Sequence, residues 1–320
     1  MLGTIAMSIF FYHLNLCLPL FLLVALGWAL IKFRFFPQEY TKVLSNFTFR
    51  LLMPVMLFHL MSDLSNMPPI DPRVIAAFFG SCTIVYWLGR RVGRLFGEDN
   101  TGQTIFGMAA IFGNNVQLGV PIVQVSLGDK AIPTISILII FTVLLLWTTA
   151  IASVEFGKTE GKKDFKKIFN SMLKVFQNPV VMGILTGTLW GLTGWQLPDW
   201  IDKTLGLVST ATTPVALMVV GMGLAAHSFS AALPKGLSMT ALKIGVQPLL
   251  VYTLARLIGL GELETQAVTV MAALPVAINI YMMAIEFKSS EGAASNAIFV
   301  STLITAITVP LTLTLLGVLT

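Results

Sequence analysis

Charge is what this chain lacks most. Of its 320 residues only 20 are Lys or Arg and 15 are Asp or Glu, so 11% of the chain is charged. A soluble globular domain carries about 25% charged residues, which cover its water-facing surface. The scarcity excludes a soluble enzyme and, because the basic residues are scattered between apolar runs, a nucleic-acid-binding protein. The hydrophobic share of 56% indicates an integral protein of the lipid bilayer instead.

Cysteines and membrane-embedded acids are also scarce. Cys17 and Cys82 both fall within apolar runs, a pattern that indicates neither a disulfide nor a metal site. Of the 15 carboxylates only Glu286 falls within an apolar run, near its end. A proton relay through a bilayer uses buried ionisable side chains, and this chain offers no mid-membrane carboxylate. No cofactor is expected, and three routes of coupling stay open: Na⁺, a proton carried by the substrate, or passive exchange.

Ten apolar runs are long enough to cross a membrane as helices, since a crossing takes about 20 residues. Lipid offers no hydrogen bonds to the backbone, so the expected fold is all-α, a polytopic bundle of ten transmembrane helices. The predicted spans are 8–31, 40–62, 72–92, 101–127, 131–154, 178–197, 203–227, 237–258, 264–286 and 292–318.

The basic residues predict the orientation of these spans. Fifteen of the 20 Lys and Arg residues fall at the odd-numbered connections and four at the even-numbered ones. Because basic residues gather on the cytoplasmic side, the odd connections are expected in the cytoplasm and both termini outside.

One connection, 155–177, is long and divides the chain into a first repeat, 1–154, and a second repeat, 178–320. Its apolar residues follow helical spacing with lysines opposite, a pattern typical of an amphipathic helix on the anionic cytoplasmic leaflet.

Prolines indicate an internal duplication. Pro19, Pro37 and Pro54 in the first half match Pro179, Pro198 and Pro214 in the second, each triplet covering 35 residues from first to third. Because each half has an odd number of spans, the second copy must be inverted in the membrane. Inverted repeats are typical of secondary transporters.

The fourth and ninth spans carry helix-breaking and polar residues at equivalent depths. Span four reads IFGNNVQLGVPIVQ, and span nine reads AALPVAINIYMMA with Pro275 and Asn279. Glycine and proline release backbone groups inside a helix, which amide side chains can satisfy. We expect two broken helices that cross at the midplane and aim their half-helix N-termini at an anion.

Several motifs resemble the auxin efflux carrier family, which includes bacterial malonate and malate carriers and plant auxin exporters. They are GNNVQLGVP, TTPVALMVVGMGLAAH, the LK of span eight before Pro248, and the ALP that opens span nine. The resemblance covers essentially the whole chain. It implies the five-plus-five inverted fold of the bile acid:sodium symporters, a bacterial inner membrane location and a homodimer formed through the scaffold. Spans 1, 2, 6 and 7 would form that scaffold, and spans 3–5 and 8–10 a transport domain that moves as an elevator.

The family's crossing motif matches Asn115, Gly119 and Pro121, and Pro275 matches in the second half. Gln117 departs from the family pattern, because relatives often have an apolar residue there, and Asn279 follows a proline after which relatives vary.

Arg50 lies inside span two, and Lys243 lies near the cytoplasmic end of span eight. Arg50, about 15 Å deep in span two, is a candidate for binding a carboxylate, with snorkelling to the headgroups as the alternative. Lys243 in span eight is expected to reach the cytoplasmic headgroups.

The sequence predicts a secondary transporter of small mono- or dicarboxylates such as malonate or malate. Asn114, Asn115, Gln117 and Asn279 would supply amide donors, and Arg50 or the Ser209–Thr213 stretch would close the site from the scaffold. A sensor or receptor for an organic anion and a carrier of an auxin-like substrate are the alternatives. A channel would show polar residues along a whole helix, and an enzyme would need a nucleophile with a base or a metal site; neither pattern is present.

Overall fold

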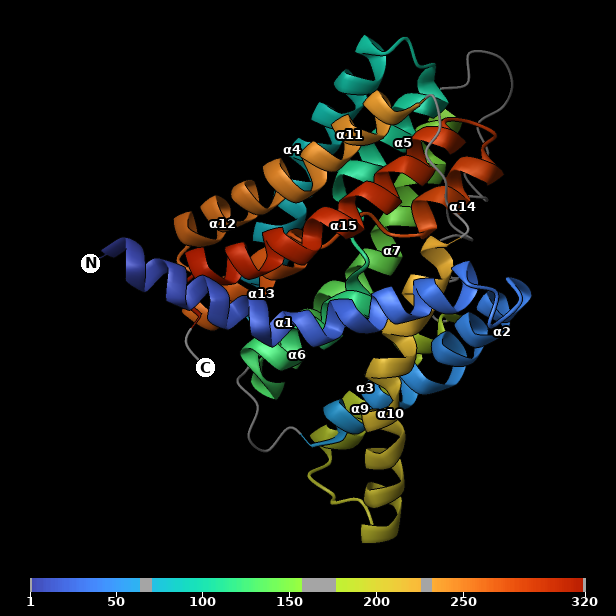
Figure 1. Ribbon diagram of the computed structural model, residues 1–320. Coiled ribbons are helices and arrows are strands. Elements are labelled where there is room, and N and C mark those ends of the chain that lie inside the picture. Colours follow the sequence, from blue (N-terminus) through green and yellow to red (C-terminus); the bar gives the residue numbers. More distant parts are fainter. Residues whose placement is uncertain (1, 64–70, 157–176, 226–231, 319–320) are drawn as a thin grey trace.

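The computed structural model describes residues 2–63, 71–156, 177–225 and 232–318 (Figure 1). Within these ranges the regular elements are all helices, and the one pair of bridged extended residues lies where two helices are interrupted. The predicted all-α fold is therefore confirmed. The predicted linker helix falls almost wholly on 157–176, outside the described residues.

The first half of the chain forms five helical stretches, of which the second and fourth are divided. The elements are α1 (Leu2–Lys32), α2 (Glu39–Phe47), η1 (Thr48–Leu52), α3 (Met53–Ser62), α4 (Arg73–Leu95), α5 (Asn100–Ile111), η2 (Asn115–Gly119), α6 (Val120–Leu127), η3 (Asp129–Ala131) and α7 (Ile132–Phe156).

The second half also forms five helical stretches, of which the third and the fourth are divided and the second is continuous. The elements are α9 (Pro179–Leu192), α10 (Asp199–Leu224), α11 (Leu233–Ala241), η5 (Leu242–Val246), α12 (Gln247–Leu257), α13 (Glu262–Ala272), α14 (Asn279–Glu286) and α15 (Glu291–Leu315).

Three of the divided helices contain a π-helical turn, and proline explains each one. Pro54, Pro121 and Pro248 each occupy the second residue of the α-helix that follows η1, η2 and η5. Proline has no N–H to donate and its ring clashes with the carbonyl one turn earlier, so the preceding turn widens. Such π turns are frequent at functional sites, and η2 and η5 both lie beside the site described below.

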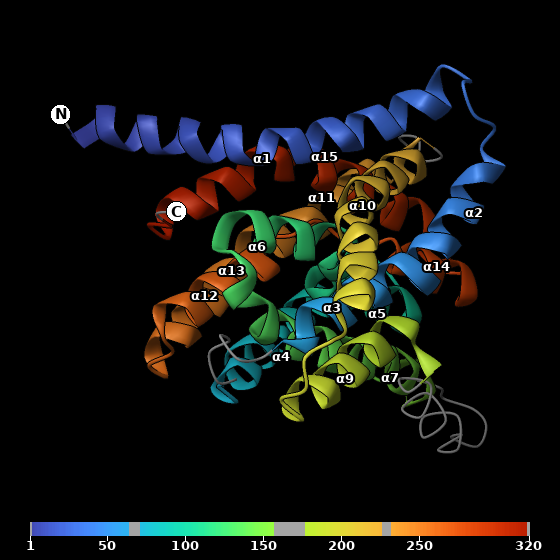
Figure 2. The same cartoon turned by 90° about the horizontal axis from the view of Figure 1, so that it is seen from below.

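The helices pack in two groups. In one, α1 lies against α10 and α3 against α9; in the other, α4 packs on α5 and α12, and α11 on α15. Figure 2 shows α1 along one edge of the molecule, beside α15 and α10. Contacts in the first group are close: a Cβ on Gly221 would lie 1.8 Å from the Val24 carbonyl oxygen, and one on Gly183 would lie 2.4 Å from that of Pro54. Only glycine lets these backbones approach.

Five helices in the described part of the chain are long and apolar enough to cross a membrane. They are Met7–Lys32, Glu39–Ser62, Asp199–Leu224, Leu233–Leu257 and Glu291–Leu315. Asn115–Leu127 and Pro179–Leu192 are shorter apolar helices. The chain is thus built for a bilayer.

Candidate functional site

The candidate site forms where the fourth and ninth helical stretches are interrupted. Between α5 and η2, and between α13 and α14, the backbone is extended, and the two extended segments pair at Gly113 and Val276. The Asn114 N–H donates to the Pro275 carbonyl, and the Ala277 N–H donates to the Phe112 carbonyl, each over 2.9 Å. The two broken helices are therefore joined by backbone hydrogen bonds at their crossing.

Three of the residues predicted for the site hold this crossing together and lie outside the cavity lining. The Pro275 carbonyl accepts the bond from Asn114. Gly119 faces the end of α13 and the segment after it, where an added Cβ would lie 3.0 Å from Met271 Sδ and 2.6 Å from Leu274 Cδ1. Pro121 is buried at the start of α6 and widens the turn before it. None of the three lines the cavity, and substrate binding by them stays a prediction.

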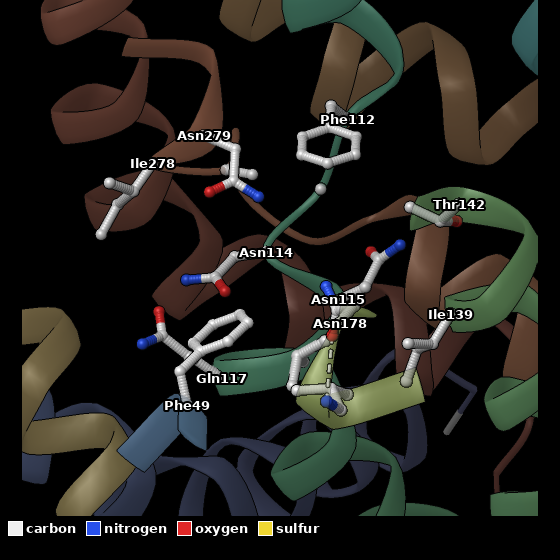
Figure 3. A pocket seen from close by; sticks show the side chains of 14 residues that line it. Phe49, Phe112, Asn114, Asn115, Gln117, Ile139, Thr142, Asn178, Ile278 and Asn279 are labelled. Atoms are coloured by element: carbon white, nitrogen blue, oxygen red, sulfur yellow. Dashed lines mark hydrogen bonds between the residues drawn. The ribbon is translucent and has the colours of Figure 1, made fainter. Parts of the chain in front are cut away.

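A cavity of about 100 Å³ lies against the crossing (Figure 3). It is lined by residues of η1, α7, α9 and both interrupted segments: Phe49, Phe112, Gly113, Asn114, Asn115, Val116, Gln117, Ile139, Thr142, Asn178, Val180, Ala277, Ile278 and Asn279.

The structure brings four predicted amide residues to this cavity: Asn114, Asn115, Gln117 and Asn279. In Figure 3 Asn114, Gln117 and Asn279 surround one side of the cavity, and Asn115 lies on the side of Thr142. η2 begins at Asn115 and α14 begins at Asn279. The first N–H groups of a helix lack partners within the helix and carry partial positive charge. The amides and two helix N-termini thus concentrate hydrogen-bond donors in one place.

Two polar atoms of the cavity lining form no hydrogen bond within the described part of the chain. Asn115 is only 5% exposed, and within the described residues neither its Oδ1 nor the buried Thr142 Oγ1 has a hydrogen-bond partner. A buried polar group without a partner costs roughly 1–3 kcal/mol. A ligand that filled the cavity and bonded these groups would remove that cost.

The rest of the cavity lining is largely apolar and was not identified from the sequence. Phe49 and Val180 line it from η1 and α9, and Thr142 lines it from α7. Asn178, also missed, precedes Pro179 and caps α9, its Oδ1 accepting the Val180 N–H over 2.9 Å. The Asn-Pro pair is a helix-start signal, but nothing in it indicates a cavity. Polar groups at one end and apolar walls suit a short carbon chain that carries a carboxylate.

Arg50 and Thr213 do not line the cavity. Arg50 is exposed on η1, next to the cavity residue Phe49, and Thr213 is half-buried on α10. The neighbouring Thr212 is buried and donates to the Leu52 carbonyl over 3.2 Å. Carboxylate binding by Arg50 and Thr213 stays a prediction.

The prediction that Lys243 reaches the headgroups is wrong. Lys243 lies on η5 and is fully buried, with its Nζ donating to the Ala272 carbonyl over 2.5 Å. One turn on, the buried Gln247 donates from Nε2 to the Ile111 carbonyl over 3.2 Å. Because Ile111 ends α5 and Ala272 ends α13, these two side chains cap the C-termini of both half-helices. In the described ranges no group of three His, Cys, Asp or Glu side chains could hold a metal ion.

The sequence model of a family described as "Membrane transport protein" matches residues 12–313. An uncharacterized transporter of Methanocaldococcus jannaschii is 24% identical over 300 residues, covering 90% of this chain and 94% of its own. A Rhizobium meliloti protein named "Putative malonate transporter" is 22% identical, covering 92% and 93%. Auxin efflux carrier component 8 of Arabidopsis thaliana is also 22% identical, covering 92% and 94%.

Proposed function

This chain belongs to the auxin efflux carrier family of membrane transport proteins, and on that premise we propose that it is a secondary carrier of small organic anions. The substrates are mono- or dicarboxylates such as malonate or malate. The malonate assignment is supported by the name of the Rhizobium meliloti relative, which is 22% identical.

One observation carries the anion assignment: two half-helix N-termini and four amide side chains converge on one cavity beside the crossing. Discontinuous membrane helices of transporters aim their N-termini at the carboxylate of a substrate. Asn114, Asn115, Gln117 and Asn279 are the proposed donors. Uncharged amide donors suit both mono- and dicarboxylates, because the donors do not require the substrate to carry a second charge.

The proposed fold is a ten-span, five-plus-five inverted repeat. The order of elements supports it, since the fourth stretch of each half is divided at an extended segment and the two segments pair at the crossing. Both termini would then lie outside a bacterial inner membrane, as the positive-inside rule predicts.

The proposed motion is an elevator in which one helix group slides along the other. The scaffold would be α1, α2, α3, α9 and α10, and the transport domain would be the remaining described helices from α4 to α7 and from α11 to α15. Within the scaffold, His59 Nε2 and Asp202 Oδ1 lie 2.9 Å apart in a hydrogen bond between α3 and α10. The cavity has Phe49, Asn178 and Val180 on the scaffold side and the crossing on the other. A site at such a boundary changes its exposure when one group moves. A homodimer would form through the scaffold.

Binding of malonate to the purified protein tests the site. Wild-type protein should bind malonate by calorimetry, and Asn115→Ala should lose binding and transport while inserting and folding normally. Gln124→Ala is the matched control, because Gln124 is an amide of the same helical stretch whose Nε2 bonds Asp129 Oδ1 over 2.9 Å, away from the cavity. Equal transport by folded Asn115→Ala protein would remove Asn115 from the site. Malonate binding without any transport would favour a sensor.

A further inference from the structure

Lys243 stands apart from the other charged residues in the described part of the chain, because it alone among them is buried. Its side chain has no exposed surface, and its Nζ bonds one backbone carbonyl, that of Ala272. An isolated ammonium is expensive to bury unless an opposite charge compensates it. Its place at the crossing therefore requires an explanation.

The groups around Lys243 supply no full negative charge. Across the described ranges Lys243 forms no ion pair. Cys82 of α4 lies beside it, a thiol whose Sγ accepts from Gln247 Nε2 over 3.4 Å. The C-terminal ends of α5 and α13 contribute partial negative charge, equivalent to about half an elementary charge per helix end. These partial charges stabilise the ammonium, but no ionised side chain among the described residues pairs with it.

The backbone at Gly113 separates this ammonium from the cavity. Gly113 lines the cavity, and a Cβ on it would lie 3.2 Å from both Lys243 Cε and Nζ, and 2.8 Å from Asn115 Oδ1. Because Gly113 has no side chain, the Lys243 ammonium can pack against the extended segment on the side opposite to the amides that face the cavity. Only the backbone at Gly113 would separate an anion in the cavity from the Lys243 ammonium. Water would screen the attraction between the two charges little in these surroundings.

Half-helix C-termini and unwound carbonyls are the groups with which transporters coordinate a coupling Na⁺. Here Lys243 and Gln247 already occupy the terminal carbonyls of α13 and α5. A cation bound there would have to displace an ammonium that is part of the chain.

We propose that Lys243 is the resident cation of the crossing: its ammonium takes the place of a coupling Na⁺ and serves as the counter-charge of the transported anion across the Gly113 backbone. This inference rests on the proposed function and adds to it that transport needs no Na⁺. Lys243 is a positioning residue, since it acts on the anion through the field and the backbone.

The test uses full-length protein and two ligands that differ in charge, malonate and malonamate. Lys243→Met keeps the length of the side chain and removes the charge, and Lys203→Met is the control, because Lys203 is exposed near the start of α10. We expect Lys243→Met to raise the Kd of malonate at least tenfold. Since Coulomb energy is proportional to charge, the Kd of the singly charged malonamate should rise only about threefold. Lys203→Met should bind both ligands as wild type does.

A second measurement needs no variant, so it holds if Lys243→Met fails to fold. Malonate counterflow by wild-type protein should be unchanged when N-methylglucamine replaces Na⁺. A Na⁺ requirement would overturn the inference. An equal loss of affinity for both ligands in folded Lys243→Met would also overturn it, because such a loss indicates a role in packing alone. Wild-type affinity in that variant would also overturn it. Failure of wild-type protein to bind any carboxylate would instead refute the proposed function.

Discussion

The unpaired amide of Asn115 predicts a variant that is more stable than wild type and inactive. Asn115→Leu replaces the amide by an apolar side chain of similar size. Asn115 is buried, and its Oδ1 has no partner among the described residues. The substitution should therefore stabilise the empty carrier and remove an amide from the cavity.

The magnitude follows from the cost of the unpaired oxygen. An unsatisfied buried polar group destabilises a protein by roughly 1–3 kcal/mol, and removal of Asn115 Oδ1 relieves part of that. For a chain of this size a gain of about 1–2 kcal/mol raises Tm by roughly 2–4 °C. Sites kept for function are often less stable than their apolar replacements.

Thermal unfolding in detergent and malonate uptake into proteoliposomes measure the two effects on the same preparation. Gln124→Leu is the control, because it removes an amide whose Nε2 bonds Asp129 outside the cavity, and it should change neither Tm nor uptake. A lower Tm for Asn115→Leu would refute the reasoning about the unpaired oxygen. Retained uptake would refute the place of Asn115 in the site.

Three further predictions concern the crossing and the scaffold. Gly113→Ala should abolish uptake in inserted protein, because its Cβ would press on the Lys243 ammonium at 3.2 Å; wild-type uptake would contradict this. Gln247→Leu should lower the free energy of unfolding by about 1–3 kcal/mol, since it leaves the carbonyl that ends α5 without its partner, and an unchanged denaturation midpoint would speak against it. Gly183→Ala should destabilise the contact of α9 with α3 by about 1–3 kcal/mol, because its Cβ would lie 2.4 Å from a backbone carbonyl; an unaltered Tm would show that the helices separate without cost.

Much of this fold could be predicted, because lipid restricts a spanning chain to helices and makes apolar runs easy to recognise. The interruptions could also be predicted, since proline and glycine act locally: α5 ends at Ile111 and α13 at Ala272, close to Gly113 and Pro275. That the two extended segments pair with each other depends on tertiary contacts, which no local pattern encodes.

The amides of the site could be found for the same local reason, and the other residues could not. Phe49 and Thr142 resemble any residues of an apolar helix, and only packing brings them to the cavity. Lys243 was misjudged because distance along a helix measures depth in the membrane but not which neighbours surround a side chain. The same distance argument gives a depth for Arg50 but not its surroundings, and its side chain is exposed on η1 next to the cavity residue Phe49.

Counterflow in proteoliposomes tests the central claim most directly, because it requires a carrier with a binding site and assumes no coupling ion. Vesicles preloaded with unlabelled malonate, malate or a related acid would be diluted into the same radiolabelled acid. Transient accumulation of label for at least one carboxylate, lost in Asn115→Ala and kept in Gln124→Ala, is the predicted result. No accumulation of any carboxylate by inserted and folded protein would contradict the carboxylate assignment.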